Sequence, residues 1–156
     1  MTVKEKTIAL VAHDNRKKDL VEWAEYNVNI LINYNLVCTG TTGVLIEEAL
    51  KEKLGENSSL LKIKKLRSGP LGGDQQMGSL IAEGKIHYLI FLWDPMEPQP
   101  HDVDVKALWR IASVYNIPTA INRSTADFII SSSLMGGNYR PLLKDFSEYL
   151  NRVVEL

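Results

Sequence analysis

Six consecutive apolar residues at 88–93, YLIFLW, limit the folds open to this chain. A strand with one face in water alternates apolar and polar side chains, whereas this run carries apolar side chains on both faces. Such a run is typical of a central parallel strand that helices cover on both sides of a sheet. We therefore expect a mainly parallel sheet in a layered α/β fold.

Short apolar runs alternate with stretches of helical periodicity along most of the chain. Further strands are expected at 8–12, 36–38, 60–66 and 118–121, and helices through 20–31, 45–50, 80–83, 105–115, 125–130 and 142–154. This order predicts a three-layer Rossmann-like sandwich with a mainly parallel five-stranded sheet. Ser124 is a candidate cap for the helix at 125–130, and 51–65 is the most loop-like interior segment. Because no repeat or linker divides the chain, we expect one domain over residues 1–156.

The charge balance argues against a nucleic-acid or membrane partner. The formal net charge is −1, so an anionic ligand would need a local site instead of a broad positive field. The single cysteine, Cys38, lies in an apolar run and is expected to be a buried structural thiol, not a nucleophile. No segment is apolar enough for a signal peptide or a membrane span, and we expect a cytoplasmic protein.

Polar residues follow each expected strand at its carboxyl end. In doubly wound sheets, ligands bind at this edge, near the point where the strand order reverses. The residues found there are His13 and Asp14, the run TGTTG at 39–43, Ser68, Gly69 and Asp74, Asp94, His101 and Asp104, and Asn122. We therefore expect the ligand site at this edge of the sheet.

The run TGTTG at 39–43 leaves a strand and opens a helix, so its N–H groups and hydroxyls could hold a phosphate. It could equally be a glycine turn with a threonine cap, and it lacks the lysine of a nucleotide-binding P-loop. Ser68 could add a hydroxyl or belong to a simple turn. Lys17 could face the anion or lie in solvent, and Lys106 and Arg110 leave the same two choices.

Two aspartates and two histidines are the candidates for chemistry. Asp74 and Asp104 each lie near a helix start, where an aspartate is either a cap or a general base that faces the ligand. His101 is either a surface histidine or a group that polarises the substrate and moves protons. The pair His13 and Asp14 could suggest a metal, but three histidines without ligand spacing make a metal site improbable.

Taken together and in order, these stretches resemble the methylglyoxal synthases over nearly the whole chain. The motifs that carry the resemblance are ALVAHD at 9–14, TGTTG at 39–43, SGPLGGDQQ at 68–76, LWDP at 92–95, PHDVDVKAL at 100–108, NIP at 116–118 and TADF at 125–128. The resemblance implies a lyase that converts dihydroxyacetone phosphate to methylglyoxal and inorganic phosphate. It also implies a Rossmann-like fold that carbamoyl phosphate synthetase uses as a regulatory domain, a homohexamer, no metal or other cofactor, and inhibition by phosphate.

Carried over residue by residue, the resemblance makes Asp74 the catalytic base, with His101 and Asp104 beside it. The residues implied in binding the substrate, mainly its phosphate, are His13, Lys17, Thr39, Gly40, Thr41, Thr42, Ser68 and Gly69. The resemblance also implies that an arginine near the C-terminus reaches into a neighbouring active site. Arg152 is the nearest candidate for this arginine. The segment 51–65 is longer than is usual in the family.

The implied mechanism begins when Asp74 removes a proton to form an enediolate. An ordinary aspartate, with a pKa of about 3.9, is a weak base for a carbon acid, so a donor such as His101 must polarise the substrate carbonyl. Two alternatives are a regulatory module that binds an anionic effector and an activity like that of triose phosphate isomerase. The first would not need Asp74, His101 and Asp104, and the second would use a glutamate base.

Overall fold

The computed structural model describes residues 5–155 and contains one parallel sheet of five strands. The strands are β1 (Thr7–Ala12), β2 (Asn35–Cys38), β3 (Lys62–Lys65), β4 (Tyr88–Leu92) and β5 (Thr119–Ala120). Their order is β3-β2-β1-β4-β5, so the chain builds outward from β1 first in one direction and then in the other. The order reverses between β1 and β4, which is where such sheets bind ligands. The predicted fold class is confirmed.

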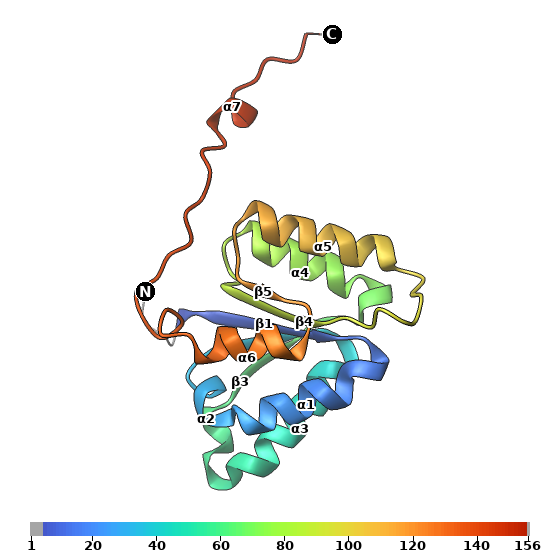
Figure 1. Ribbon diagram of the computed structural model, residues 1–156, viewed down its shortest axis with the longest axis vertical. Coiled ribbons are helices and arrows are strands. Elements are labelled where there is room, and N and C mark those ends of the chain that lie inside the picture. Colours follow the sequence, from blue (N-terminus) through green and yellow to red (C-terminus); the bar gives the residue numbers. More distant parts are fainter. Residues whose placement is uncertain (1–4, 156) are drawn as a thin grey trace.

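Helices cover both faces of the sheet (Figure 1). The helices α1 (Lys17–Tyr26), α2 (Val28–Leu31), α3 (Gly40–Leu54) and α6 (Arg123–Ser131) lie on one side. The helices α4 (Gly73–Ala82) and α5 (Asp102–Val114) lie on the other side. The central strands therefore contact helices on both faces and avoid water, as their apolar sequence predicted.

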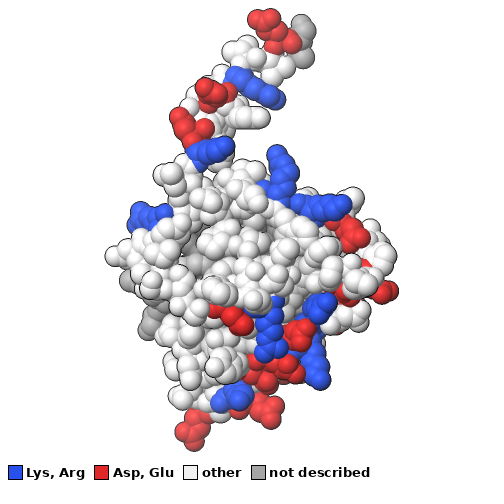
Figure 2. Space-filling view, viewed as in Figure 1, with Lys and Arg blue, Asp and Glu red and all other residues white. Residues whose placement is uncertain are grey.

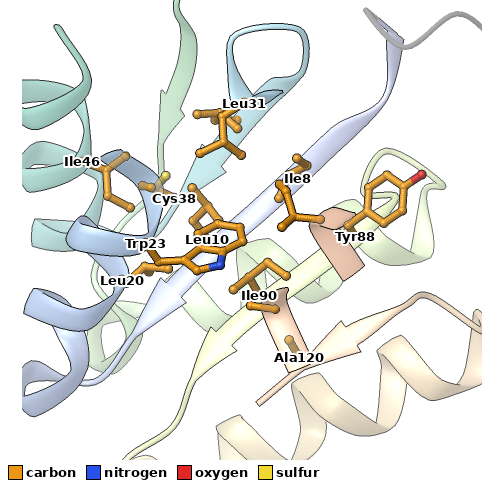
Figure 3. Packing of buried hydrophobic residues seen from close by; sticks show 14 of the residues in the cluster. Ile8, Leu10, Leu20, Trp23, Leu31, Cys38, Ile46, Tyr88, Ile90 and Ala120 are labelled. Carbon is orange, nitrogen blue, oxygen red and sulfur yellow. The ribbon is translucent and has the colours of Figure 1, made fainter. Parts of the chain in front are cut away.

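Alternate residues of β1 pack into two separate apolar cores. Ile8 and Leu10 belong to the core beneath α1, α2, α3 and α6, whereas Ala9 and Val11 belong to the core beneath α4 and α5. Figure 3 shows Trp23 of α1 directed toward the strands in the first of these cores. Burying one large aliphatic side chain such as Leu10, which is fully buried, stabilises the fold by about 1.5–3 kcal/mol.

The structure corrects the expectation of a loop at 51–65. Helix α3 continues to Leu54, a 3-10 helix (η3) covers Gly55–Leu60, and β3 follows at once. Gly55, the C-cap residue of α3, has a φ of +54°, a positive value that residues with a side chain rarely adopt. Glu47 of α3 forms an ion pair with Lys51 one turn further along the same helix and another with Lys65, which connects α3 to the outer strand β3. The run GENSS at 55–59, which made this segment loop-like in sequence, forms the 3-10 helix, and β3 lies within the strand expected at 60–66.

Two further predictions about helices are wrong. The cap of α6 is Asn122, whose side chain accepts a hydrogen bond of 2.8 Å from the Thr125 N–H, and not Ser124. The expected helix at 142–154 shrinks to α7 (Ser147–Leu150) within an extended arm that leads away from the sheet (Figure 1). A helix this short is marginal unless it packs on a surface, and the apolar side chains of Tyr149 and Leu150 within α7 are exposed.

Cys38 is buried as expected, and burial raises the pKa of its thiol to about 12. Within residues 5–155, no helix is both long and apolar enough to cross a membrane. On the face shown in Figure 2, acidic and basic side chains are interspersed, in keeping with the balanced charge of the chain.

Candidate active site at the carboxyl ends of the strands

A cavity of about 240 Å³ opens where β1, β2 and β4 end. It is lined by Val11, Ala12, His13, Asp14, Lys17, Thr39, Gly40, Thr41, Thr42, Ser68, Gly69, Pro70, Asp74, Phe91, Gln99 and His101. These lining residues include every predicted site residue except Asp104. Segments far apart in the chain therefore meet at the edge of the sheet that the sequence indicated.

The first turn of α3 forms one wall of the cavity. Thr39 is the N-cap residue of α3, but its side chain makes no capping hydrogen bond. Thr41 and Thr42 lie in the first turn, where N–H groups have no acceptor within the helix. Such N–H groups, at the positive end of the helix dipole, are suited to binding an anion.

Gly40 brings this turn against the loop that carries Ser68. Its φ is +42°, and a Cβ atom built there would lie 2.6 Å from the Ser68 Cα atom. The Gly40 N–H donates to the carbonyls of Leu66 and Arg67, which fixes the contact. The positive φ and the lack of space for a Cβ atom both require glycine at position 40. Its presence allows Ser68 to lie beside the end of the helix.

Lys17, the first residue of α1, reaches across to α3. Its ammonium donates to the Thr41 hydroxyl over 2.6 Å and to the carboxylate of Asp14. This hydrogen bond and the lysine charge hold the pKa of Asp14 below its usual range. Lys17 therefore adds positive charge beside the first turn of α3, and a cation together with free helix N–H groups is suited to a phosphate. Lys106 and Arg110 are exposed on α5 and do not line the cavity.

Asp74 and His101 face each other across the opposite side of the cavity. The Asp74 Oδ2 atom lies 3.6 Å from the His101 Nε2 atom, and the Asp74 side chain is only 2% exposed. Gly72 is the N-cap of α4, so Asp74 lies inside the first turn and does not act as the cap. Within the described part of the chain, neither Asp74 Oδ2 nor His101 Nδ1 has a hydrogen-bond partner.

The surroundings of Asp74 make it a stronger base than an ordinary aspartate. Burial raises the pKa of Asp74; the charge of His101 opposes this rise, and that of Asp104 adds to it. Asp104 is half-buried in the first turn of α5 and is not part of the cavity wall. The structure therefore places Asp104 where its charge acts on Asp74 without lining the cavity itself.

His13 has a defined protonation state. Its Nδ1 atom accepts a hydrogen bond of 3.1 Å from the backbone N–H of Asp94, so a neutral ring carries its proton on Nε2. The Nε2 atom is buried and has no hydrogen-bond partner among residues 5–155. Burial and the nearby His101 lower the pKa of His13, which favours the neutral ring.

Several functional groups escaped the sequence reasoning. Gln99 lines the cavity although no quoted motif contained it, and Pro70 and Phe91 line it although they were quoted without a role in the site. Asp94 was noted at a strand end but received no role, because its contact with His13 depends on the position of its backbone N–H. The turn sequence Asp94-Pro95 was the only local signal of a fixed loop at this point.

Comparison with known proteins agrees with this geometry. A family model described as the MGS-like domain matches residues 19–121. The chain is 56% identical to the methylglyoxal synthase of Maridesulfovibrio salexigens over 96% of its own length and 98% of that protein's. It is 47% identical to the methylglyoxal synthase of Coxiella burnetii strain RSA 493 over 99% of its own length and 100% of that protein's. The crystal structure of methylglyoxal synthase from Elizabethkingia anophelis matches with a TM-score of 0.85 and 48% identity, and covers 99% of this chain and 95% of the other.

The fold and the site define an MGS-like α/β domain, with an anion cradle and a buried carboxylate at the switch point of the sheet. Within that class, identity near one half over almost the full length is decisive. The chain belongs to the methylglyoxal synthase family.

Proposed function

We propose that this protein converts dihydroxyacetone phosphate to methylglyoxal and inorganic phosphate, as a carbon–oxygen lyase. The observation that carries the proposal is one cavity with two different walls. Lys17, Thr41 and the first-turn N–H groups of α3 form one wall, here called the anion cradle, and the buried carboxylate of Asp74 lies on the other. The names of the relatives support the reaction. A regulatory module would need only the cradle, so the Asp74–His101 pair favours an enzyme.

The first step is removal of a proton from the hydroxyl-bearing carbon by Asp74. The electron pair of this C–H bond moves into the adjacent carbon–carbon bond, and the carbonyl oxygen takes up negative charge to give an enediolate. Burial of Asp74 raises its pKa, which brings the base closer to the strength that a carbon acid requires. His101, beside Asp74, and His13 supply N–H groups that stabilise the developing oxyanion.

The second step is loss of phosphate from the neighbouring carbon. The hydroxyl on the deprotonated carbon loses its proton, and its oxygen forms the new aldehyde C=O bond. The C=C electron pair of the enediolate shifts to form a new carbon–carbon double bond to the phosphate-bearing carbon, and the bond from that carbon to the bridging phosphate oxygen breaks. Phosphate leaves with the electron pair of the broken bond and takes up the hydroxyl proton. The remaining enolate takes up a proton at its terminal carbon to become methylglyoxal. Lys17, Thr41 and the first-turn N–H groups of α3 stabilise the leaving dianion. The cradle must hold the breaking bond out of the enediolate plane, since an in-plane phosphate would be retained.

We further propose a single functional domain that assembles as a cytoplasmic homohexamer and is inhibited by free phosphate in the same cradle. The C-terminal arm supports an assembly, because Leu142, Leu150 and Val153 are more than four-fifths exposed on it. Arg152 lies on this arm beside the ring of Tyr149, so it could reach a neighbouring subunit only if the arm docks there. Deletion of residues 141–156 should reduce the molar mass of the assembly measured by light scattering.

A coupled time course tests the reaction. Purified protein is mixed with dihydroxyacetone phosphate, and three products are followed: inorganic phosphate, methylglyoxal as its dicarbonyl adduct, and glyceraldehyde 3-phosphate through a dehydrogenase. We expect phosphate and methylglyoxal in equal amounts, with no loss of rate in a chelator. Glyceraldehyde 3-phosphate as the main product, with phosphate retained, would instead establish an isomerase and refute the proposal.

A further inference from the structure

The ring of His13 is held by a network that begins outside the cavity wall. The carboxylate of Asp94 accepts hydrogen bonds from the Asn15 side chain over 2.9 Å and from the Met96 N–H over 3.0 Å. These contacts fasten the loop after β4 both to itself and to the turn that follows His13. The backbone N–H of Asp94 then donates to His13 Nδ1 over 3.1 Å, and this contact is buried.

Only one form of the histidine ring satisfies this contact. A proton on Nδ1, in the other neutral tautomer or in the cation, would set two donors against each other at 3.1 Å. It would also leave the buried N–H of Asp94 without an acceptor, which costs free energy. The neutral ring with its proton on Nε2 avoids both penalties, and it presents that proton on the side of the ring away from Asp94.

We propose that Asn15 and Asp94 are positioning residues that hold His13 as the Nε2–H tautomer and aim this donor at a substrate oxygen. The inference rests on the proposed function, since it assumes that the cavity holds the triose phosphate. A donor with this fixed direction stabilises negative charge on the oxygen without any rearrangement during the reaction.

The groups that face His13 favour the same state. Burial and the His101 ring lower the pKa of His13, whereas Asp102, Asp94 and Asp14 oppose this shift. His13 makes T-shaped contacts with two rings. Its centroid lies 5.3 Å from that of Phe91 and 5.8 Å from that of His101. These contacts restrict the plane of the His13 ring, so the Asp94 N–H decides which nitrogen carries the proton.

NMR of protein labelled with ¹⁵N in histidine tests the proposal directly. The chain has three histidines, which single substitutions assign. In the protein without substrate, we expect His13 to show a protonated Nε2 and an unprotonated, hydrogen-bonded Nδ1 at about pH 7. In Asn15→Ala, the His13 signals should move toward a mixture of tautomers. Because Asn15 is exposed, we expect this variant to fold as the parent protein does.

Kinetics on the same variant tests positioning. We expect kcat of Asn15→Ala to fall about three- to tenfold, the loss of one aligned hydrogen bond, with KM and phosphate affinity unchanged. Asn15→Asp keeps the size of the side chain but places a second carboxylate beside that of Asp94, so kcat should fall further. The matched control is Asn57→Ala in the exposed 3-10 helix after α3, which should match the parent protein in spectrum and rate.

Either of two results would overturn the proposal: a wild-type His13 that carries a proton on Nδ1, or an Asn15→Ala protein with its His13 spectrum or kcat unchanged. The spectra are recorded without substrate, so they report the tautomer of His13 even if the protein forms no methylglyoxal. Normal methylglyoxal production with an Nδ1–H tautomer would refute the positioning role alone and leave the proposed function intact.

Discussion

Asp74 and His101 lie with Oδ2 and Nε2 3.6 Å apart, and Gly69 packs directly against both of these atoms. The contact joins the first turn of α4 to the residue that precedes α5. A buried carboxylate without a hydrogen-bond donor on Oδ2 is costly for the fold, so this pair is expected to trade stability for reactivity.

Asp74→Asn should lower kcat by about 10²- to 10⁴-fold, as expected for the loss of a general base. The same variant should melt at a higher temperature at about pH 7. Burial raises the pKa of Asp74 in the folded protein, so ionisation of this side chain costs stability above its unfolded pKa of about 3.9. Calorimetry should show the difference between the parent protein and the variant shrinking as the pH falls through the raised pKa of folded Asp74, and vanishing below the unfolded pKa of about 3.9, where Asp74 is protonated in both states. Near-normal turnover in folded Asp74→Asn would remove Asp74 from the mechanism.

Gly69→Ala should impair catalysis while leaving the fold intact. A Cβ atom there would lie 2.9 Å from His101 Nε2 and 3.0 Å from Asp74 Oδ2, so the two side chains must move apart. We expect kcat to fall at least about tenfold, because catalytic groups tolerate little displacement. Gly136→Ala is the control, since a Cβ at Gly136 meets nothing within 4 Å. Equal activity of the two variants would contradict the assigned geometry.

Lys17→Ala and Thr41→Ala should weaken substrate and phosphate together. A charge-assisted hydrogen bond contributes about 1.5–3 kcal/mol, so KM and the phosphate inhibition constant should each rise about ten- to a hundredfold. Lys106→Ala, on the exposed side of α5, should change neither constant. If either cradle variant weakened substrate but not phosphate, that residue would not hold the phosphoryl group.

The pH dependence of kcat/KM should report the surroundings of Asp74. Its acid limb should lie above about pH 3.9, because burial raises the pKa of this base. The charge of His101 lowers the pKa of Asp74 and that of Asp104 raises it. His101→Asn should therefore move the residual acid limb to higher pH, and Asp104→Asn should move it to lower pH. Shifts in the same direction would mean that another group titrates.

The sequence by itself determined the elements and the edge of the sheet where the polar residues gather. The run at 88–93 is apolar on both faces because β4 lies between two layers of helices, and this information is contained within a few neighbouring residues. The same local reasoning failed at 142–154, where helical periodicity was present but most apolar side chains of the described segment are exposed and do not stabilise a long helix by packing. It also failed at Ser124, because α6 begins at Arg123, one residue before Ser124, and Asn122 is therefore its cap.

Only the tertiary structure decided how the site works. The roles of Asp74 and Asp104 as cap or base stayed open in sequence, and the position of Gly72 at the start of α4 resolved the cap interpretation for Asp74. The contact between His13 and Asp94 joins residues 81 positions apart, and it exists because parallel pairing brings the ends of β1 and β4 side by side. Periodicity describes which face of an element a residue occupies. Which atoms meet across elements depends on strand register and loop conformation, and both are set by packing of the whole chain.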